Sequence, residues 1–218
     1  MKIDFISSHH KKTKRNYLER VINIDKAKAA TIAKKWAYQY WDGSRDINYG
    51  GYYYDGRWSP IAKKMINYYK LNNKSKILDV GCGKGFLLYE FHKLLPGCQI
   101  FGQDISSYAI KNSKKEIRKF IKKGSATNLK YKSNYFDLVI SLNTLHNLYC
   151  FDLVKSLEEI ERVSKKNKYI CVESYRSEKE KVNLLYWQVT CECFFTPNEW
   201  KWFFKQSGYK GDYSFIYF

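Results

Sequence analysis

The sequence predicts an α/β fold in which a mainly parallel sheet carries helices on both of its faces. From residue 76 onward, short apolar runs alternate with amphipathic segments, which is the pattern of strands connected by helices. Glycines follow the first of these runs, as they do where a strand turns tightly into a helix. The chain has 218 residues, of which 44% are hydrophobic, and this is enough for one sizeable core.

Two helices and a long loop are predicted before the sheet begins. Residues 25–40 are rich in alanine and lysine, with apolar side chains at helical spacing. Residues 40–60 are rich in glycine and in aromatic residues, which suits a long ordered loop better than a helix or a strand. Pro60 then opens a short helix that reaches about residue 69, because proline fits the first turn of a helix.

The first half of the sheet is predicted from three apolar runs. KILDV at 76–80 is short and ends at glycines, so we predict a buried strand there. A helix is predicted at 85–95, followed by a second strand at 98–104. Ser106 can cap the next predicted helix, at 106–115, with its side chain. A third and weaker strand is predicted at 120–125.

The second half of the sheet contains the strongest predicted strand, FDLVISL at 136–142. Residues 196–199 read Thr-Pro-Asn-Glu, a capping box with proline at the first helical position, so they open the last helix. An amphipathic helix is predicted at 151–164, a strand at 168–174 and a final strand with alternating side chains at 213–218.

The net charge of +18 raises the question of nucleic-acid binding. Only seven of the 39 basic residues are arginine, which is the usual bidentate reader of bases and phosphates. A lysine excess spread over helix surfaces is typical of solvated faces. We therefore do not expect a nucleic-acid partner.

Membrane segments, secretion signals and metal sites are not expected either. No apolar run approaches the roughly 20 residues needed to cross a bilayer, and residues 1–20 are basic without an apolar core segment. The six cysteines form no CxxC pair and lack a zinc partner set, so we interpret them as reduced thiols. These features predict a cytoplasmic protein.

The glycine loop between the first strand and its helix is the most informative segment. Gly81, Gly83 and Gly85 permit a tight turn and allow a ligand to approach the backbone closely. Asp79 precedes the loop, and Asp104 ends the next strand, where a carboxylate can accept hydrogen bonds from both hydroxyls of a ribose. This context predicts a nucleotide-binding site at the carboxyl ends of the strands.

A pyrophosphate cofactor such as NAD is the competing interpretation of the glycine loop. Its fingerprint ends in a small residue that lets helix and strand pack closely. The chain has Phe86 at that position, which is far too bulky, so we do not expect NAD. A tight turn without any ligand is the other alternative, and the glycines and acids at the required offsets disfavour it.

Four segments carry a family resemblance: KILDVGCGKGFLLYE at 76–90, FGQDIS at 101–106, GSATNL at 124–129 and FDLVISLNTLHNL at 136–148. They resemble motifs of the class I S-adenosylmethionine-dependent methyltransferases, and the first is the most specific. The similarity covers roughly residues 40–218. It implies a Rossmann-like three-layer sandwich with a seven-stranded sheet whose last strand is antiparallel, and S-adenosylmethionine as cofactor. We expect the cofactor-binding domain at 60–218, after a helical and aromatic-loop cap at 1–59.

By position, the resemblance implies which residues contact the cofactor. Asp79 is expected to hold the amino group of the methionine part, Asp104 the ribose and Ile105 the adenine. Ser125 stands where the family often has an acid, so this contact departs from the pattern. The full expected set is Asp79, Gly81, Cys82, Gly83, Gly85, Asp104, Ile105, Ser125, Ala126 and Asn143.

His146 and Glu173 are the candidates for a general base. His146 follows the fourth strand beside the expected methyl group, and a histidine titrates in the range that suits proton transfer. It is equally suited to bracing the helix that follows. Glu173 ends the fifth strand, where it suits a base, a partner for a substrate amine or a surface ion pair.

The loop at 40–60 is the candidate lid over cofactor and acceptor, because aromatic faces attract cations such as a sulfonium or an ammonium. An Ω-loop packed by its own side chains is the alternative. Arg176, beyond the fifth strand, suits a carboxylate or phosphate. The expected acceptor-binding residues are Tyr49, Tyr52, Tyr54, Arg57, Trp58, Tyr175 and Arg176.

The sequence favours methyl transfer to an oxygen or nitrogen atom of a small molecule, such as a sugar-linked or phosphorylated precursor. It lacks the Asn/Asp-Pro-Pro-aromatic motif of amino-directed nucleic-acid enzymes, the Pro-Cys of cytosine-5 enzymes and the paired glutamates of arginine methyltransferases. Two alternatives stay open: an RNA or protein methyltransferase that uses the lysine-rich surface, and a non-catalytic module that binds S-adenosylmethionine. The fold alone does not choose among them.

Overall fold

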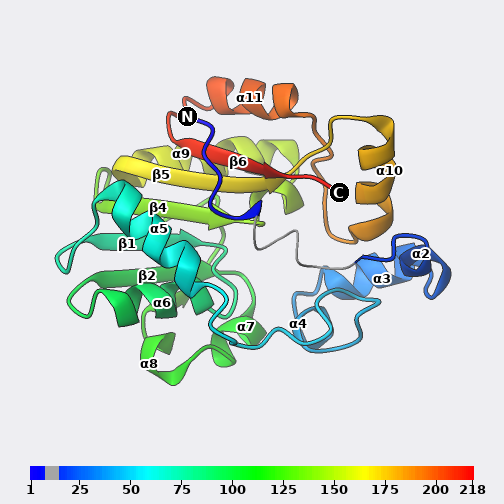
Figure 1. Cartoon of the computed structure of the whole chain (residues 1–218), viewed down its shortest axis with the longest axis horizontal. Coiled ribbons are helices and arrows are strands. Elements are labelled where there is room, and N and C mark those ends of the chain that lie inside the picture. The colour runs from blue at the N-terminus through cyan, green and yellow to red at the C-terminus, as the bar shows by residue number, and fades with distance from the viewer. Residues whose placement is uncertain (8–14) are drawn as a thin grey trace.

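The computed structural model describes residues 1–7 and 15–218 of the chain (Figure 1). Within these residues, six strands form one sheet in the order β3-β2-β1-β4-β5-β6. Every neighbouring pair of strands in this sheet is parallel. The strands are β1 (Lys76–Val80), β2 (Gln99–Asp104), β3 (Ile121–Lys123), β4 (Phe136–Leu142), β5 (Ser164–Glu173) and β6 (Asp212–Ile216).

The sheet confirms the predicted α/β class and corrects two details of it. The resemblance predicts seven strands with an antiparallel last one, whereas the described residues form six, and β6 runs parallel to β5 with Asp212 opposite Tyr169. The reason is the connection between these strands, which passes through α10 (Glu178–Trp187) and α11 (Pro197–Gln206). Such a helical crossover returns the chain to the starting end of the sheet, so the next strand runs in the same direction.

Helices cover both faces of the sheet and complete the three layers (Figure 1). α5 (Ser59–Tyr69) and α6 (Phe86–Leu94) pack on one face, whereas α9 (Cys150–Val163) and α11 pack on the other. The remaining helices of the described residues are α2 (Glu19–Ile22), α3 (Lys26–Ala33), α4 (Tyr38–Trp41), α7 (Ser107–Lys111), α8 (Lys115–Arg118) and the 3₁₀-helix η1 (Leu145–Asn147).

Two apolar cores hold these layers together, one on each face of the sheet. The core on one face includes Met65 of α5, Phe91 of α6 and Ile77 of β1. The core on the other face includes Trp200 of α11 and Leu78 of β1. Successive side chains of a strand point to opposite faces, so β1 is anchored in both cores. This doubly anchored strand leads directly into the glycine loop.

Helices α2 and α3, within the predicted cap, lie beside α10 (Figure 1). The helix predicted at 25–40 is split into α3 and α4, since Trp36 takes a left-handed φ of 52° between them. Ala29 and Ala33 of α3 pack with Tyr40 and Trp41, which joins the helical part of the cap to the aromatic loop. The helix predicted at 106–115 is likewise replaced by the two short helices α7 and α8.

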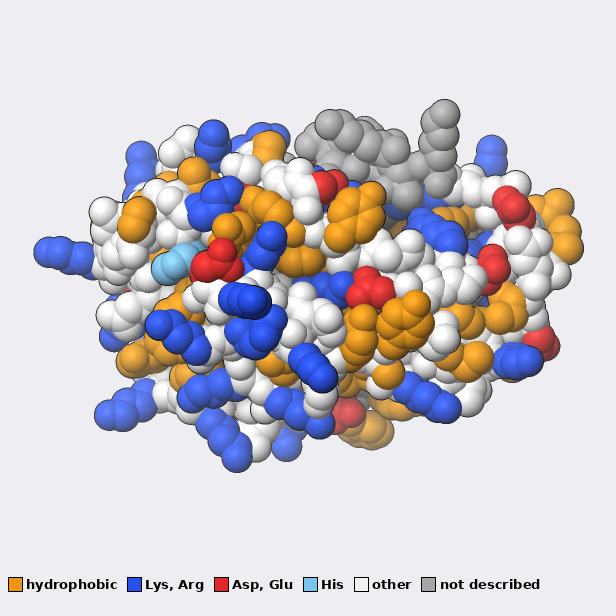
Figure 2. Space-filling model, turned by 90° about the horizontal axis from the view of Figure 1, so that it is seen from below, with side chains coloured by type: hydrophobic (Ala, Val, Ile, Leu, Met, Phe, Trp, Pro, Cys, Tyr) orange, Lys and Arg blue, Asp and Glu red, His pale blue; other side chains and the backbone are white. Residues whose placement is uncertain are grey.

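The surface carries the positive charge expected from the sequence. On the face seen in Figure 2, lysine and arginine side chains are spread among hydrophobic and acidic ones. None of the described helices is both long enough and apolar enough to cross a membrane. The six cysteines are unpaired, and the cytoplasmic location stays a prediction.

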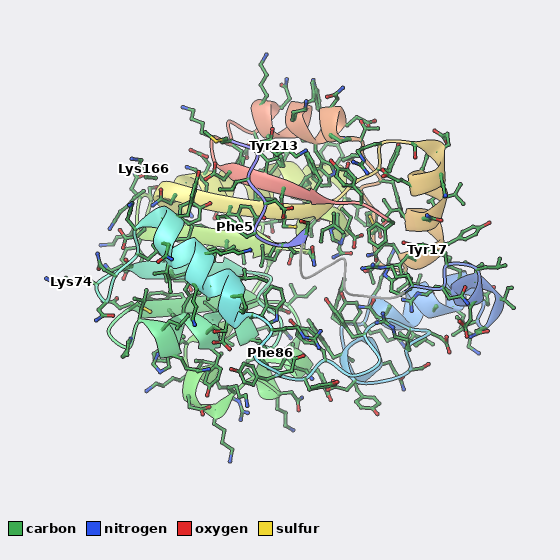
Figure 3. All side chains as sticks on the ribbon, in the orientation of Figure 1. Phe5, Tyr17, Lys74, Phe86, Lys166 and Tyr213 are labelled. Carbon is green, nitrogen blue, oxygen red and sulfur yellow. The ribbon has the colours of Figure 1, made fainter. Side chains whose placement is uncertain are left out.

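The first residues of the chain join the sheet. Lys2 forms a parallel bridge with Tyr213, and the N–H of Ile3 donates to the carbonyl of Tyr213 at 3.0 Å. Phe5 packs edge-on against Tyr169 with ring centroids 5.0 Å apart, and Figure 3 shows it close to β5 and β6. The division into a cap at 1–59 and a domain from residue 60 stays a prediction.

Candidate functional site

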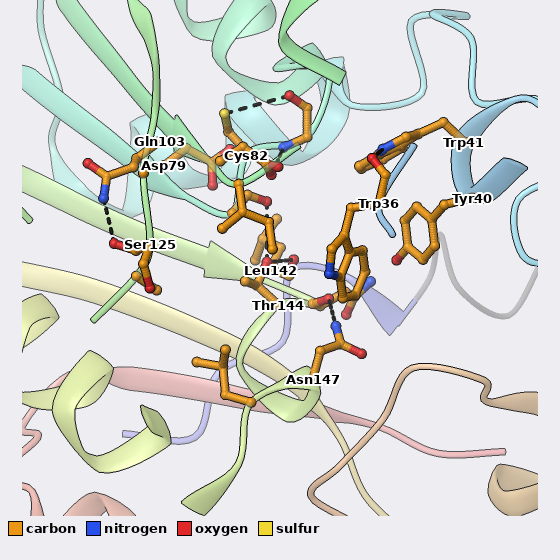
Figure 4. A pocket seen from close by; sticks show the side chains of 18 of the residues that line it. Trp36, Tyr40, Trp41, Asp79, Cys82, Gln103, Ser125, Leu142, Thr144 and Asn147 are labelled. Carbon is orange, nitrogen blue, oxygen red and sulfur yellow. Dashed lines mark hydrogen bonds between the residues drawn. The ribbon is translucent and has the colours of Figure 1, made fainter. Parts of the chain in front are cut away.

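A cavity of about 380 Å³ lies at the carboxyl ends of β1, β2 and β4 (Figure 4). Its floor is formed by the glycine loop after β1 and by the residues that end β2 and β4. Ligands of parallel α/β sheets bind at this kind of position, where the strand order reverses. Nine of the ten expected cofactor residues line the cavity, namely Asp79, Gly81, Cys82, Gly83, Asp104, Ile105, Ser125, Ala126 and Asn143.

The glycine loop adopts backbone conformations that favour glycine. Gly81 and Gly83 have φ angles of 76° and 56°, in the left-handed region. The N–H groups of Gly81 and Cys82 donate to the carbonyl of Gln103 at 2.7 and 3.3 Å, which fixes the loop against β2. A Cβ on Gly83 would lie 2.6 Å from the ring of Trp41. The bare backbone therefore lets this ring close on the loop.

Gly85, the tenth expected cofactor residue, is not among the described residues that line the cavity. It precedes α6 with a left-handed φ of 69°. A Cβ there would lie 2.8 Å from Ile117 and 2.7 Å from Ile121. The glycine at this position thus serves the close packing of α6 against α8 and β3.

Asp104 ends β2 with its carboxylate fixed by two backbone groups. Its Oδ2 accepts a hydrogen bond from the N–H of Gly83 at 2.7 Å, and its Oδ1 accepts one from the N–H of Ser106 at 2.7 Å. Burial raises the pKa of this carboxyl, although the two hydrogen bonds oppose the rise. Each oxygen keeps a second lone pair, so the carboxylate can also accept ligand hydroxyls.

Asp79 is a buried acid that accepts no hydrogen bond in the described part of the chain. It is only 4% exposed and it lines the cavity. Burial, reinforced by the nearby charge of Asp104, raises the pKa of Asp79 from 3.8 to about 8. A carboxylate held in this way is stabilised by a cationic group in the cavity.

An aromatic wall forms the side of the cavity that faces the glycine loop. Trp41 stacks on Tyr49 with centroids 5.4 Å apart and planes 7° from parallel. The Nε1 of Trp41 donates to the Oγ of Ser106 at 3.0 Å, which ties the wall to the residue after β2. Figure 4 shows Trp36, Tyr40 and Trp41 on this side. The aromatic wall consists of Trp36, Tyr40, Trp41, Tyr49 and Tyr52.

Lys84, within the glycine loop, latches the aromatic loop onto the cavity floor. Its Nζ donates to both carboxylate oxygens of Asp42, at 2.7 and 2.6 Å, and to the carbonyl of Tyr52 at 2.6 Å. Asp42 also accepts hydrogen bonds from the hydroxyl of Tyr108 and the N–H of Tyr52. Burial opposes ionisation of Asp42, but these partners lower its pKa below the ordinary value. The latch therefore couples the position of the wall to that of the loop.

Two side-chain amide oxygens lining the cavity accept no hydrogen bond within the described residues. They are Oδ1 of Asn143 and Oδ1 of Asn147, and both are buried. Asn143 has a left-handed φ of 54°, and its carbonyl accepts a hydrogen bond from the Nδ2 of Asn147 at 3.3 Å. Buried acceptors normally find a donor in protein, water or ligand. These two oxygens are therefore available to an O–H or N–H group of a bound molecule.

Comparison with known proteins decides the family. A family model described as a methyltransferase domain matches residues 71–208, which is more than half of the chain. The chain belongs to this methyltransferase family. Class I methyltransferases use S-adenosylmethionine as methyl donor, and residues 71–208 of the chain are a methyltransferase domain of this family.

The methyltransferase matches curated relatives over part of their length. It is 31% identical over 130 residues to a tRNA (carboxymethyluridine(34)-5-O)-methyltransferase of Arabidopsis thaliana, which covers 59% of this chain and 30% of the relative. It is 37% identical over 89 residues to the mitochondrial arginine-hydroxylase NDUFAF5 of Mus musculus, which covers 40% of this chain and 25% of the relative. The chain thus spans less than a third of the length of these two relatives.

A solved structure shares the fold of the methyltransferase. The YcgJ protein from Bacillus subtilis superposes with a TM-score of 0.55 at 19% sequence identity, over 67% of this chain and 66% of that one. At such low identity the likeness speaks for the fold alone. It confirms the Rossmann-like α/β class.

The two general-base candidates of the methyltransferase lie behind the cavity surface. His146 and Glu173 are 2% and 5% exposed, and neither is among the described residues that line the cavity. The Nε2 of His146 lies 3.5 Å from the Oε2 of Glu173. Burial lowers the pKa of His146 to about 3 and raises that of Glu173 to about 8. At neutral pH this geometry favours a neutral bracing pair, and a base role stays a prediction.

The expected acceptor-binding residues divide into two groups. Arg57 pairs with Asp55, and Arg176 pairs with Glu180, so each guanidinium is already neutralised by a neighbour in the sequence. Of the seven expected acceptor-binding residues, three line the cavity: Tyr49, Tyr52 and Trp58. The other four are not among the described lining residues: Tyr54, Arg57, Tyr175 and Arg176.

Sequence reasoning misses several residues that line the cavity. The Nε2 of Gln103 donates to the carbonyl of Ser125 at 2.6 Å, so this side chain positions the loop after β3. Asn147 lies four residues after Asn143, and helical spacing after β4 is the signal that could have revealed it. The missed lining residues include Trp36, Gln103, Thr144, Asn147, Tyr149 and Asp152.

Proposed function

We propose that the methyltransferase transfers a methyl group from S-adenosylmethionine to an oxygen or nitrogen atom of a small molecule. The observation that carries this proposal is the aromatic wall, which closes one side of the cavity above the glycine loop. A cavity of about 380 Å³ with aromatic lining has the size and composition that small ligands use. An extended strand of nucleic acid needs an open basic groove instead.

The residues of the floor fit S-adenosylmethionine, and we assign them to it. When bound, this cofactor supplies an electrophilic methyl group on a sulfonium. Asp79 offers an unpaired buried carboxylate to the α-ammonium group, and Asp104 offers lone pairs to the ribose hydroxyls. The aromatic wall stabilises positive charge through its ring faces. The other residues assigned to the cofactor are Gly81, Cys82, Gly83, Ile105, Ser125, Ala126 and Asn143.

The acceptor is held, in this proposal, by the amide oxygen of Asn147, which lies beside Asn143 of the cofactor set. This oxygen needs a donor, and a hydroxyl or amine acceptor carries one. Displacement at a sulfonium depends mainly on alignment of the attacking atom and exclusion of water. Since His146 and Glu173 lie off the cavity surface, the proposal relies on this alignment rather than on a buried base.

RNA methylation is the second candidate function. Its support is the Arabidopsis thaliana relative, whose name describes a tRNA methyltransferase. Tyr149 lines the cavity and is 66% exposed, and the nearby Phe151 is 91% exposed, so both rings are available for base stacking. The net charge of +18 favours association with RNA as well.

A transfer assay separates the two candidates. Methyl-labelled S-adenosylmethionine is incubated with the protein and either pools of phosphorylated metabolites, sugars and amines, or total tRNA. We expect label in a small molecule, with stoichiometric S-adenosylhomocysteine. Label that appears only in tRNA contradicts the proposal and favours the second candidate.

A variant links the assay to the cavity. Asn147→Ala is expected to raise KM for the acceptor by about tenfold while leaving S-adenosylmethionine affinity within about twofold, because one acceptor hydrogen bond is lost. Asn112→Ala, at an exposed position on the surface after α7, is the matched control and is expected to behave like the wild type. Equal KM values in both variants would argue against the assigned role of Asn147.

A further inference from the structure

Three of the seven arginines converge on the indole ring of Trp187, at the end of α10. The guanidinium carbons of Arg15, Arg20 and Arg45 lie 5.2, 4.7 and 5.0 Å from the ring centroid. Tyr17 packs edge-on against the same ring with centroids 6.1 Å apart, and Figure 3 shows Tyr17 beside α10. We call Arg15, Arg20 and Arg45 the arginine cluster.

Two members of the arginine cluster, Arg20 and Arg45, lack the ion pairs seen at other guanidiniums of the described residues. Arg57 and Arg176 are each paired with an acid close in sequence. Within residues 1–7 and 15–218, Arg20 and Arg45 form no ion pair and donate to backbone carbonyls instead. The segment at 8–14, outside the described residues, reads SHHKKTK and contains no acid. The excess positive charge therefore calls for an anion from outside the chain.

Mutual repulsion accompanies burial in this cluster. Arg20 is 6% exposed. Its burial, and to a smaller extent the positive charge of Arg45, lower its pKa to about 10, although the negative charge of Asp46 opposes this shift. Burial and the charge of Arg20 likewise lower the pKa of Lys26 to about 8. Like charges held together away from water are stabilised when an anion binds among them.

Backbone carbonyls fix two of the guanidiniums and leave donors unused. The Nε of Arg20 donates to the carbonyl of Trp187 at 3.0 Å, and its Nη1 donates to the carbonyl of Arg45. The Nη1 of Arg45 donates to the carbonyls of Asn48 and Tyr49, at 3.0 and 2.9 Å. In the part of the chain that the structure describes, the Nη2 atoms of Arg20 and Arg45 donate to no protein group. Both are thus positioned to donate to a bound oxyanion.

A second cavity, of about 460 Å³, borders the arginine cluster and Trp187. Asn16 and Asn23 add side-chain amides to its lining, and Glu19 and Asp46 are the acids among the described lining residues. Three guanidiniums against two carboxylates leave the lining positive. A phosphoryl group brings about two negative charges and three acceptor oxygens, so it suits three separate guanidiniums better than a carboxylate does.

The arginine cluster lies next to the aromatic wall of the methyltransferase site. Arg45 holds the carbonyl of Tyr49, whose ring belongs to the wall. Glu173 is also near enough to Arg15, Tyr40 and Tyr49 to influence the pKa of each when it is ionised. A small molecule held at the cluster is therefore near the acceptor side of the site.

We propose that the arginine cluster and Trp187 bind the phosphoryl group of a small phosphorylated methyl acceptor. This assignment names the substrate class of the proposed small-molecule methyl transfer and rests on it. A single cavity beside the buried Arg20 suits one phosphoryl group. RNA binding instead uses an extended series of exposed cations along its backbone.

The test is calorimetric titration of the full chain with inorganic phosphate, with acetate and with a short single-stranded RNA, at constant ionic strength. Arg45→Gln removes an exposed member of the cluster, and Arg20→Gln removes the buried one. Arg118→Gln is the matched control, since its guanidinium donates to the carbonyl of Ser113 outside the cluster. We expect phosphate to bind the wild type and Arg118→Gln, to bind Arg45→Gln about tenfold more weakly, and to bind more tightly than acetate or RNA.

Titration of S-adenosylmethionine into each protein separates the possible failures. Phosphate binding that is the same in Arg45→Gln and the wild type overturns the arginine assignment, and so does acetate binding as tight as that of phosphate. RNA binding without phosphate binding overturns the small-molecule assignment. In each of these results, retained S-adenosylmethionine binding leaves the proposed methyl transfer standing. A wild type that binds phosphate but not S-adenosylmethionine overturns the proposed function itself. Because Arg45 is exposed, Arg45→Gln keeps the test valid if Arg20→Gln fails to fold.

Discussion

The buried carboxyl of Asp79 leads to a prediction with opposite signs for stability and for cofactor affinity. Its pKa is about 8 in the folded protein, whereas its ordinary value, which applies to the unfolded chain, is 3.8. The carboxyl proton therefore dissociates more readily from the unfolded chain. The stability that Asp79 contributes is complete below about pH 4 and is lost as the pH rises through 8. At pH 7, about 3 units above the ordinary pKa, Asp79→Asn is expected to stabilise the unliganded protein by up to about 4 kcal/mol.

The same carboxyl makes cofactor affinity depend on pH. An ammonium group binds the ionised form, and at pH 6 only about 1% of a carboxyl with a pKa near 8 is ionised. About half of the carboxyl is ionised at pH 8, so the affinity for S-adenosylmethionine is expected to rise by about 50-fold between pH 6 and pH 8. Asp79→Asn is expected to bind more weakly than the wild type at pH 8 and to show little change over this range.

Urea unfolding followed by circular dichroism measures the first effect, and calorimetric titration at several pH values measures the second. Asp137→Asn is a matched control with the opposite expectation. The N–H of Lys76 and the Nζ of Lys165 both donate to Asp137 at 2.8 Å and, despite burial, lower its pKa, so the amide should destabilise the protein. An Asp79→Asn protein that is less stable than the wild type at pH 7, or that binds S-adenosylmethionine equally well, would refute this reasoning.

Three further predictions concern the latch, the glycine loop and the buried histidine. Lys84→Met leaves a partly buried carboxylate unpaired and is expected to cost about 2 kcal/mol in urea unfolding. Lys181→Met, in an exposed pair with Glu178, is expected to cost less than about 1 kcal/mol, and equal costs would contradict the latch. Gly83→Ala is expected to weaken S-adenosylmethionine binding at least about tenfold in calorimetry, because its Cβ would strike the aromatic wall. Gly208→Ala has a similar φ with open space around its Cβ and is expected to bind normally, and normal binding by both variants would count against the proposed loop geometry. The pKa of His146 is about 3 in the folded protein and ordinarily 6.5, so the stability that this residue contributes is complete above pH 6.5 and falls as the pH drops toward 3. His146→Gln is therefore expected to reduce the loss of stability in acid. An unchanged acid-unfolding curve for this variant would contradict the neutral, buried histidine.

The sequence predicted those parts of the site whose chemistry is local. Gly81 and Gly83 stand where the backbone must be left-handed, and glycine is the residue that tolerates this conformation. Asp104 follows an apolar run that could only be a buried strand, so its place at the cavity floor followed from the strand prediction. The alternation of strands and helices was sufficient to locate the carboxyl edge of the sheet.

Features set by packing between distant segments could not be predicted in the same way. His146 follows β4 in sequence, but its 3₁₀ turn is buried and the side chain lies behind the cavity surface. The arginine cluster depends on α10 packing beside the cap, which brings Trp187 against Arg20 and Arg45 across more than a hundred residues. The direction of β6 depends on how the crossover through α11 packs on the sheet, and the capping box that predicts this helix does not encode its packing.

Local charge patterns, in contrast, indicate that two arginines expected to bind the acceptor form ion pairs with neighbouring acids instead. Arg57 has Asp55 two residues before it, and Arg176 has Glu180 four residues after it, a spacing at which side chains on a helix meet. Both arginines were expected to bind an acceptor, yet each is held by its neighbour. An arginine whose guanidinium forms no ion pair among the described residues, such as Arg20 or Arg45, is the better candidate for an anion site.

The central claim is that the glycine loop and Asp104 bind S-adenosylmethionine. The most direct test is calorimetric titration of the wild type and of Asp104→Ala with S-adenosylmethionine and, separately, with NAD. Micromolar one-to-one binding of S-adenosylmethionine, lost in Asp104→Ala, and no binding of NAD are the predicted results. A well-folded wild type that binds no S-adenosylmethionine, or that binds NAD tightly in spite of Phe86, would contradict the claim.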